Sequence, residues 1–201
     1  MKTADHLLLA NRLIAKCAAT LPADAAAGLR IGSVLPDCNP FTYLCETHDG
    51  FGVHGHNADA TRHRISTLLA RTENGGARDF LYGLRLGTAL HYIADAFTYP
   101  HHAYFPGTLA DHVRYEEHLH TVFARHNEQL QELPCVKISE FPAFLDTALD
   151  IYRTKRKNEL DDCRFINSMC AAALKAALVT TEKEIVFHEN TDYDRPVSAV
   201  R

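Results

Sequence analysis

The sequence predicts an all-α, single-domain multi-helix bundle with a metal cluster in a cleft of its core. Apolar residues recur at helical spacing along most of the chain, and no segment alternates well enough to predict a strand. Thirteen histidines are present, ten of them between His48 and His120, which is more than a hydrophobic core requires. The helical domain is predicted to span residues 1–187, followed by a polar tail over residues 188–201.

The helices are predicted in order from apolar spacing and from breaker residues. Residues 3–19 form an amphipathic helix that Pro22 stops, and a short helix over residues 23–31 ends near Gly32. Residues 34–55 contain two prolines and three glycines, so they are predicted to form a long loop of functional type. The later helices are predicted over residues 57–72, 77–98, 109–133, 139–158 and 159–187.

The composition excludes several classes of protein. Apolar residues make up 46% and charged residues 23% of the chain, as in a globular domain with a sizeable core. The formal net charge of −4 offers no basic footprint, so we expect no stable nucleic-acid binding. No apolar run reaches the roughly 18 to 20 residues of a transmembrane segment. Charges interrupt the N-terminal apolar run, which argues against a signal peptide, and we expect a cytoplasmic protein with reduced thiols.

Two predicted helices each place a histidine four residues before a carboxylate. His91 and Asp95 share one face of their helix, the face that Gly87 thins so that another backbone can approach. Burying this pair is costly unless a metal ion or a mutual hydrogen bond satisfies both groups, and the spacing leaves both possibilities open. His112 and Glu116 repeat the arrangement on the next helix, where a solvated face with a local hydrogen bond is the simpler explanation.

Further candidate ligands lie in two predicted loops and in the first helix. They are His101 in "TYPHHAYF", Asp37 in "LPDCNP", His48, His54 and His56 in "HDGFGVHGHN", and His6 among the leucines of the first helix. Together with the two helical pairs they supply nitrogen and oxygen ligands from at least four segments. Zinc takes such ligands, and bundle cores are where multi-metal sites are built.

The order and spacing of "PD", "GHN", "HYIAD", a histidine after the following proline, and "HVRYE" resemble the zinc-dependent phospholipase C family, whose all-α fold is shared with S1/P1-type nucleases. The resemblance covers about residues 6–120 and implies two to three Zn²⁺ ions in a cleft. The implied sites are Asp37, His56, His91 and Asp95 for one ion, His101, His112 and Glu116 for a second, and His6 with a bridging Asp95 for a third. His54 stays open as an alternative to His56, and His102 as an alternative to His101.

The sequence also departs from that family. Its secreted members expose an N-terminal tryptophan whose amino group and carbonyl complete the third site, whereas this chain contains no tryptophan and starts with Met1 and Lys2. The third site is therefore expected to be weaker, empty or completed differently. The chain also lacks the C-terminal membrane-binding domain of the toxin-like members, which argues against attack on intact membranes.

The function predicted from these residues is zinc-dependent hydrolysis of a small phosphate ester or phospholipid by a phospholipase C-like phosphodiesterase. Metal ions would clamp the phosphate and activate a water molecule, which Asp37 or Asp95 would orient or deprotonate. Two alternatives stay open: an S1/P1-like nuclease, and a non-catalytic metal-binding protein that retains the fold. For the nuclease, only the basic run at residues 152–158 offers a nucleic-acid surface. Nothing in the sequence indicates the oligomeric state.

Overall fold

A computed structural model describes residues 1–17, 20–38, 44–47, 50–53, 58–73, 77–125 and 136–189 of the chain. The helices are α1 (Thr3–Lys16), α2 (Ala23–Cys38), α3 (Ala58–Glu73), α4 (Phe80–Ala96), α5 (Leu109–Arg125), α6 (Phe141–Lys155) and α7 (Glu159–Glu189). Short 3-10 turns cover Tyr99–His101 and Ile138–Glu140, and strands β1 (Leu44–Thr47) and β2 (Gly50–Val53) form an antiparallel hairpin. The predicted all-α, single-domain bundle is confirmed, and the predicted tail lies outside the described residues from residue 190 onward.

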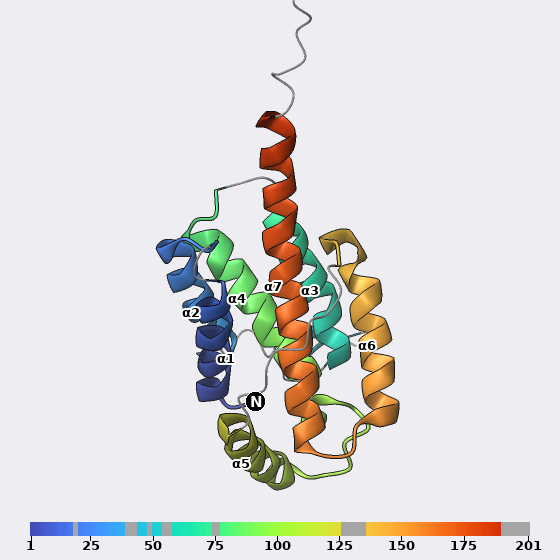
Figure 1. The fold of residues 1–201 in the computed structure, drawn as a ribbon. Coiled ribbons are helices and arrows are strands. Elements are labelled where there is room, and N and C mark those ends of the chain that lie inside the picture. The colour runs from blue at the N-terminus through green and yellow to red at the C-terminus, as the bar shows by residue number, and fades with distance from the viewer. Residues whose placement is uncertain are drawn as a thin grey trace, which may run out of the picture.

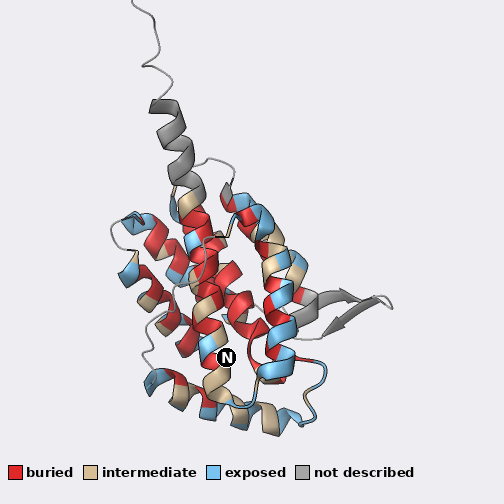
Figure 2. Cartoon of the chain, turned by 45° about the vertical axis from the view of Figure 1, so that its right-hand side comes forward, coloured by how far each residue is buried: buried red, intermediate tan, exposed pale blue. Residues whose placement is uncertain are grey.

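Helices α4 and α7 form the centre of the bundle. Helix α4 packs against α2, α3 and α7, while α7 also contacts α5 and α6. Figure 1 shows α1 and α2 on one side of α7, α3 and α6 on the other, and α5 lying across the lower end beside the N-terminus. Figure 2 shows the buried residues on the inward faces of these helices and the exposed residues on their outward faces, as amphipathic periodicity requires.

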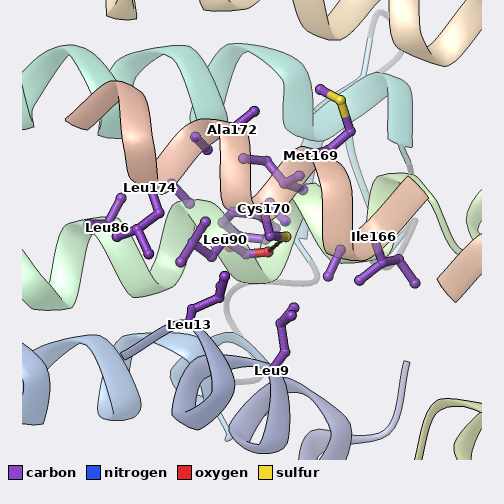
Figure 3. Close-up of a cluster of buried hydrophobic side chains, with 14 of the residues drawn as sticks. Leu9, Leu13, Leu86, Leu90, Ile166, Met169, Cys170, Ala172 and Leu174 are labelled. Carbon is purple, nitrogen blue, oxygen red and sulfur yellow. Dashed lines mark hydrogen bonds between the residues drawn. The ribbon is translucent and has the colours of Figure 1, made fainter. Parts of the chain in front are cut away.

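The main core lies where α1, α4 and α7 meet. Figure 3 shows it with Leu9 and Leu13 from α1, Leu86 and Leu90 from α4, and Ile166, Met169, Cys170, Ala172 and Leu174 from α7. The Cys170 thiol donates a hydrogen bond to the carbonyl of Leu90 at 3.5 Å, and burial raises its pKa, so it is a packed thiol rather than a reactive one. None of the described helices is both long and apolar enough to cross a membrane.

Helices α2 and α4 touch through their backbones. A Cβ atom added at Gly83 would lie 1.9 Å from the carbonyl oxygen of Ala25, and one added at Gly87 would lie 2.2 Å from that of Leu29. Only glycine permits such an approach. The predicted role of Gly87 in admitting another backbone is therefore confirmed, and α2 is held close to the face of α4 that carries His91.

The predicted end of the second helix near Gly32 is wrong, because α2 continues through Pro36 to Cys38. Proline removes the backbone N–H that would have bonded the carbonyl four residues earlier, which is that of Gly32. The Thr88 hydroxyl of α4 lies 3.4 Å from this carbonyl, but it donates its proton at 2.8 Å to the carbonyl of Leu84 in its own helix. A Cβ atom added at Gly32 would lie 2.2 Å from the Leu84 carbonyl oxygen, so α2 meets α4 through its backbone at this point. Gly32 is thus a packing contact with α4 rather than a stop signal.

The prediction of a loop over residues 34–55 without strands is also wrong. Its first part completes α2, and its second part contains the hairpin, in which Leu44 pairs with Val53 and Thr47 with Gly50. Strands separated by two residues are typical of hairpins, but each strand has only four residues and two of those in β2 are glycine, so the apolar alternation is too short to detect. The predicted ligand His56, with His48 and His54, lies outside the described residues.

Candidate metal centre

Helices α1 and α4 bring three buried side chains together. His6, His91 and Asp95, called the inner group below, have potential ligand atoms within 4.8 Å of one another. Asp95 Oδ1 lies 3.2 Å from His6 Nε2, and its Oδ2 lies 3.3 Å from His91 Nε2. The two imidazoles stack at 3.9 Å between centroids, so one carboxylate faces two parallel rings that come from different helices.

The end of α2 supports and extends the inner group. The carbonyl of Ser33 lies 2.9 Å from His91 Nδ1, which leaves Nε2 of that ring directed at Asp95. Such a contact on the second nitrogen fixes the tautomer and orientation of metal-binding histidines. Asp37, one turn after Ser33, lies with Oδ1 3.6 Å from His91 Nε2 and accepts a hydrogen bond from the Thr3 hydroxyl at 2.8 Å.

A second group of ligand atoms, called the outer group, consists of His101, His112 and Glu116. His101 comes from the 3-10 turn after α4, and the other two residues come from successive turns of α5. Nε2 of each histidine lies 3.2 Å from the same oxygen, Oε1 of Glu116. The Nδ1 atom of His101 lies 3.6 Å from Asp95 Oδ2, so the outer group adjoins the inner one.

The α-amino group of Met1 lies between the two groups. It is 3.0 Å from Asp95 Oδ1, 2.9 Å from Glu116 Oε1 and 3.5 Å from His101 Nε2. The sequence interpretation left the third site open and did not place Met1 there. The sequence did contain a signal for the position of Met1. A helix that starts at residue 3 and turns His6 inward carries the preceding residues to the same end of the bundle as His6.

The charges at the centre keep two carboxyl groups in the anionic state that metal binding needs. Burial opposes ionisation of Asp95, but the Met1 ammonium and the imidazoles of His101 and His91 hold its pKa well below the usual range. Burial likewise opposes ionisation of Glu116, yet hydrogen bonds from neighbouring histidines keep the pKa of that carboxyl well below its usual range. Both carboxylates are therefore anionic at neutral pH, as metal ligands must be.

The two inner histidines differ in their protonation. Burial, followed by repulsion from His91, lowers the pKa of His6 to about 4, so this imidazole is neutral at physiological pH. Burial also acts to lower the pKa of His91, but Asp95 and Asp37 outweigh it and raise that pKa above its usual value. A neutral His6 can offer a lone pair to a cation, whereas His91 holds a proton more strongly than an ordinary imidazole and would have to release it to bind a cation.

His6 provides a direct test of whether a metal ion fits. The residue is 1% exposed, and among the described residues neither of its ring nitrogens has a hydrogen-bond partner, although Nε2 lies near Asp95. A buried imidazole left in this state is costly unless something binds it. The nitrogen and oxygen donors that converge on this point match those that zinc takes in proteins, so the residues fit the ion.

Most of the predicted ligands are therefore close together, and their role as ligands stays a prediction. His6, His91 and Asp95 form the inner group, Asp37 adjoins it, and His101, His112 and Glu116 form the outer group. His102, the open alternative to His101, is instead buried with its ring stacked on those of Tyr104 and Tyr152.

Comparison with known proteins agrees with this geometry. The family described as zinc dependent phospholipase C matches residues 5–177. No curated protein and no solved structure gives a match to the chain. The matched segment contains all six residues of the inner and outer groups, while Met1 lies just before it. Since the match spans far more than half of the sequence, the chain belongs to the zinc-dependent phospholipase C family.

Proposed function

We propose that the protein is a zinc-dependent hydrolase of phosphate esters, and that it acts as a phospholipase C-like phosphodiesterase on a phospholipid or a small phosphodiester. The observation that carries the proposal is the adjacency of the two groups, because His101 lies 3.2 Å from Glu116 and 3.6 Å from Asp95. Neighbouring metal sites are the arrangement that phosphoester hydrolysis uses to stabilise the attacking and leaving oxygens together. Membership in the family supports the same chemistry.

The inner group with Asp37 would hold one or two zinc ions, and the outer group another. When bound, zinc polarises a phosphate and lowers the pKa of a water molecule to near neutrality. The protein's own contribution is to position the donors. Ser33 orients His91, and α4 presents Asp95 to histidines of both groups.

Asp37 is the better candidate for the base. Its side chain is 16% exposed, whereas that of Asp95 is 1% exposed and lies among the Met1 ammonium and the imidazoles of both groups. A water oxygen would attack phosphorus while Asp37 takes its proton. The ester P–O bond would then break, and the leaving alkoxide would take that proton from the Asp37 carboxylic acid, which returns Asp37 to its anionic form. Asp95 would then serve to hold the two groups together.

The first experiment measures zinc and turnover on the same untagged sample. Elemental mass spectrometry after purification without chelators should find two to three zinc equivalents per chain. Hydrolysis of bis(p-nitrophenyl) phosphate and of monomeric short-chain phosphatidylcholine should depend on that zinc. The variant Asp95→Asn should lose both zinc and turnover. Asp150→Asn is a matched control, because Asp150 is exposed on α6 and its carboxylate contacts Arg153 of the same helix.

The outcomes separate the competing functions. Activity that survives Asp95→Asn with unchanged zinc would remove the inner group from the mechanism. Cleavage of single-stranded nucleic acid in place of both phosphodiesters would assign the site to nuclease chemistry. Two zinc equivalents without turnover of any phosphodiester would leave a metal-binding protein that retains the fold.

A further inference from the structure

Away from the ligand groups, the first turn of α7 contains a buried carboxylate with four hydrogen-bond donors. Asp162 is 0% exposed. Its Oδ1 accepts from the Tyr152 hydroxyl and from Arg156 Nε, each at 2.9 Å. Its Oδ2 accepts from the Tyr115 hydroxyl at 2.5 Å and from the backbone N–H of Tyr99 at 3.3 Å. These four bonds use the full acceptor capacity of a carboxylate.

Two of the four donors flank the outer group. Tyr99 begins the 3-10 turn that contains His101, and Tyr115 directly precedes Glu116 in α5. Both donors bind the same oxygen of Asp162. The Oδ2 atom of Asp162 in α7 therefore joins two elements: the 3-10 turn, which carries His101, and helix α5, which carries Glu116.

Arg156 closes the arrangement. Its guanidinium lies 3.9 Å from the centroid of the Tyr99 ring and also donates to the Tyr115 hydroxyl. The ion pair between Arg156 and Asp162 is largely buried, with side chains 13% and 0% exposed. Desolvation makes such a pair a poor source of net stability, and its best-attested use is to fix the register of the elements it joins.

We propose that Asp162 is a positioning residue for the outer group: by joining the 3-10 turn to α5 it sets the separation of His101 and Glu116, and so the affinity of that group for a divalent metal ion. The hydrogen bonds of Asp162 go to residues beside His101 and Glu116 rather than to these two side chains, so it acts through Tyr99 and Tyr115. This inference rests on the proposed metal-binding role of the outer group.

The test compares Asp162→Asn with Asp161→Asn in the full chain. An amide cannot accept hydrogen bonds on both sides, and its oxygen stays with the cationic Arg156 because charge-assisted bonds are the stronger ones. The Asp162 variant therefore leaves the Tyr99 N–H facing an NH₂ group. Asp161 is a matched control: it lies in the same turn and loses the same charge, but it contacts the Lys157 N–H and Arg164 instead.

The measurement is a stepwise zinc titration of metal-free protein against a chromophoric chelator. The step that belongs to the outer group is identified as the one that His112→Ala removes. Asp162→Asn should weaken that step about 10- to 100-fold, the usual effect of losing a partner that orients a metal ligand. The remaining steps, and every step of Asp161→Asn, should be unchanged. Hydrogen exchange of the metal-free protein should show faster exchange at the Tyr99 amide in Asp162→Asn alone.

Two tyrosine variants keep the test decisive if Asp162→Asn folds poorly. Tyr115→Phe and Tyr152→Phe each remove one hydroxyl that donates to Asp162, but only Tyr115 lies on α5. Positioning predicts that Tyr115→Phe weakens the outer step at least several-fold and that Tyr152→Phe does not. Equal effects of the two variants, or an equal weakening of all zinc steps, would overturn the proposal and leave Asp162 a general structural residue.

The outcomes for this inference and for the proposed function can be told apart. A wild-type protein that binds zinc at the outer group but hydrolyses no phosphodiester refutes the function and leaves the positioning test valid. An active wild type whose outer step is unchanged by both Asp162→Asn and Tyr115→Phe overturns the positioning role and leaves the function standing. A wild type without an outer zinc step overturns both.

Discussion

Gly87→Ala tests whether the contact between the backbones of α2 and α4 builds the inner group. The added methyl carbon would lie 2.2 Å from the Leu29 carbonyl oxygen and 2.9 Å from the Ser33 nitrogen. An ordinary contact needs at least 3.4 Å, so the two backbones would have to separate by about 1 Å. Backbone atoms cannot rotate away as side-chain ends can, and the strain therefore spreads to both helices.

The expected cost is the difference between two opposing terms. Replacing glycine by alanine inside a helix ordinarily adds about 1 kcal/mol of stability. Overpacking a close-packed interior typically costs about 1 to 3 kcal/mol, and contact with rigid backbone places this substitution at or above the upper end. We expect Gly87→Ala to lower the free energy of unfolding by about 2 kcal/mol net.

The assay is urea unfolding of the metal-free protein, because bound zinc would add its own stabilisation. Gly107→Ala is the control, since its methyl group would meet only side-chain atoms of Phe105 and Asp111 at close range. Gly87→Ala should also weaken zinc binding at the inner group, because separating the helices draws the Ser33 carbonyl away from His91. An unfolding midpoint equal to or above that of the wild type would refute the close approach of α2 and α4.

Three other predictions concern the N-terminal charge, the hydrogen bonds of Arg78 and the metal content. In the chain that starts at Met1, the ammonium pKa is about 10 against an ordinary 8.0, despite the opposing effect of burial, because two carboxylates hold the charge. The charged ammonium should stabilise the metal-free protein by at most about 3 kcal/mol. This stabilisation should be complete below pH 8 and lost as the pH rises to about 10. A urea unfolding midpoint that stays constant over that pH range would contradict this. Arg78→Ala should lower the free energy of unfolding by about 2 kcal/mol. The reason is that Arg78 donates to the Thr20 carbonyl at 2.8 Å and to the Leu178 carbonyl at 2.6 Å. An unchanged urea midpoint would show that these two hydrogen bonds contribute nothing. His112→Ala should remove one zinc equivalent by elemental mass spectrometry, and full zinc content would exclude it as a ligand.

Local sequence spacing was sufficient where the helix itself fixes the geometry. His91 and Asp95, and likewise His112 and Glu116, lie four residues apart, so each pair had to share a helix face in any tertiary arrangement. The helix starts were also predicted to within three residues, because apolar spacing and proline breakers act over one or two turns. The same local logic failed at Gly32 and Pro36, because Gly32 serves the close approach of α2 to α4 and the helix continues past both residues.

Only the tertiary structure decided which of these local pairs meet. Met1 reaches Glu116 across 115 positions of the chain, and Asp162 reaches Tyr99 across 63. No periodicity relates residues so far apart, because their contact depends on how whole helices pack rather than on the turn in which each residue lies. The sequence by itself determined an all-α bundle with histidine and carboxylate pairs on its helices. Packing of α1, α4 and α5 around one end of the bundle decided that these pairs form two adjoining groups around one buried amine, because the burial of apolar faces sets helix positions and the ligands follow.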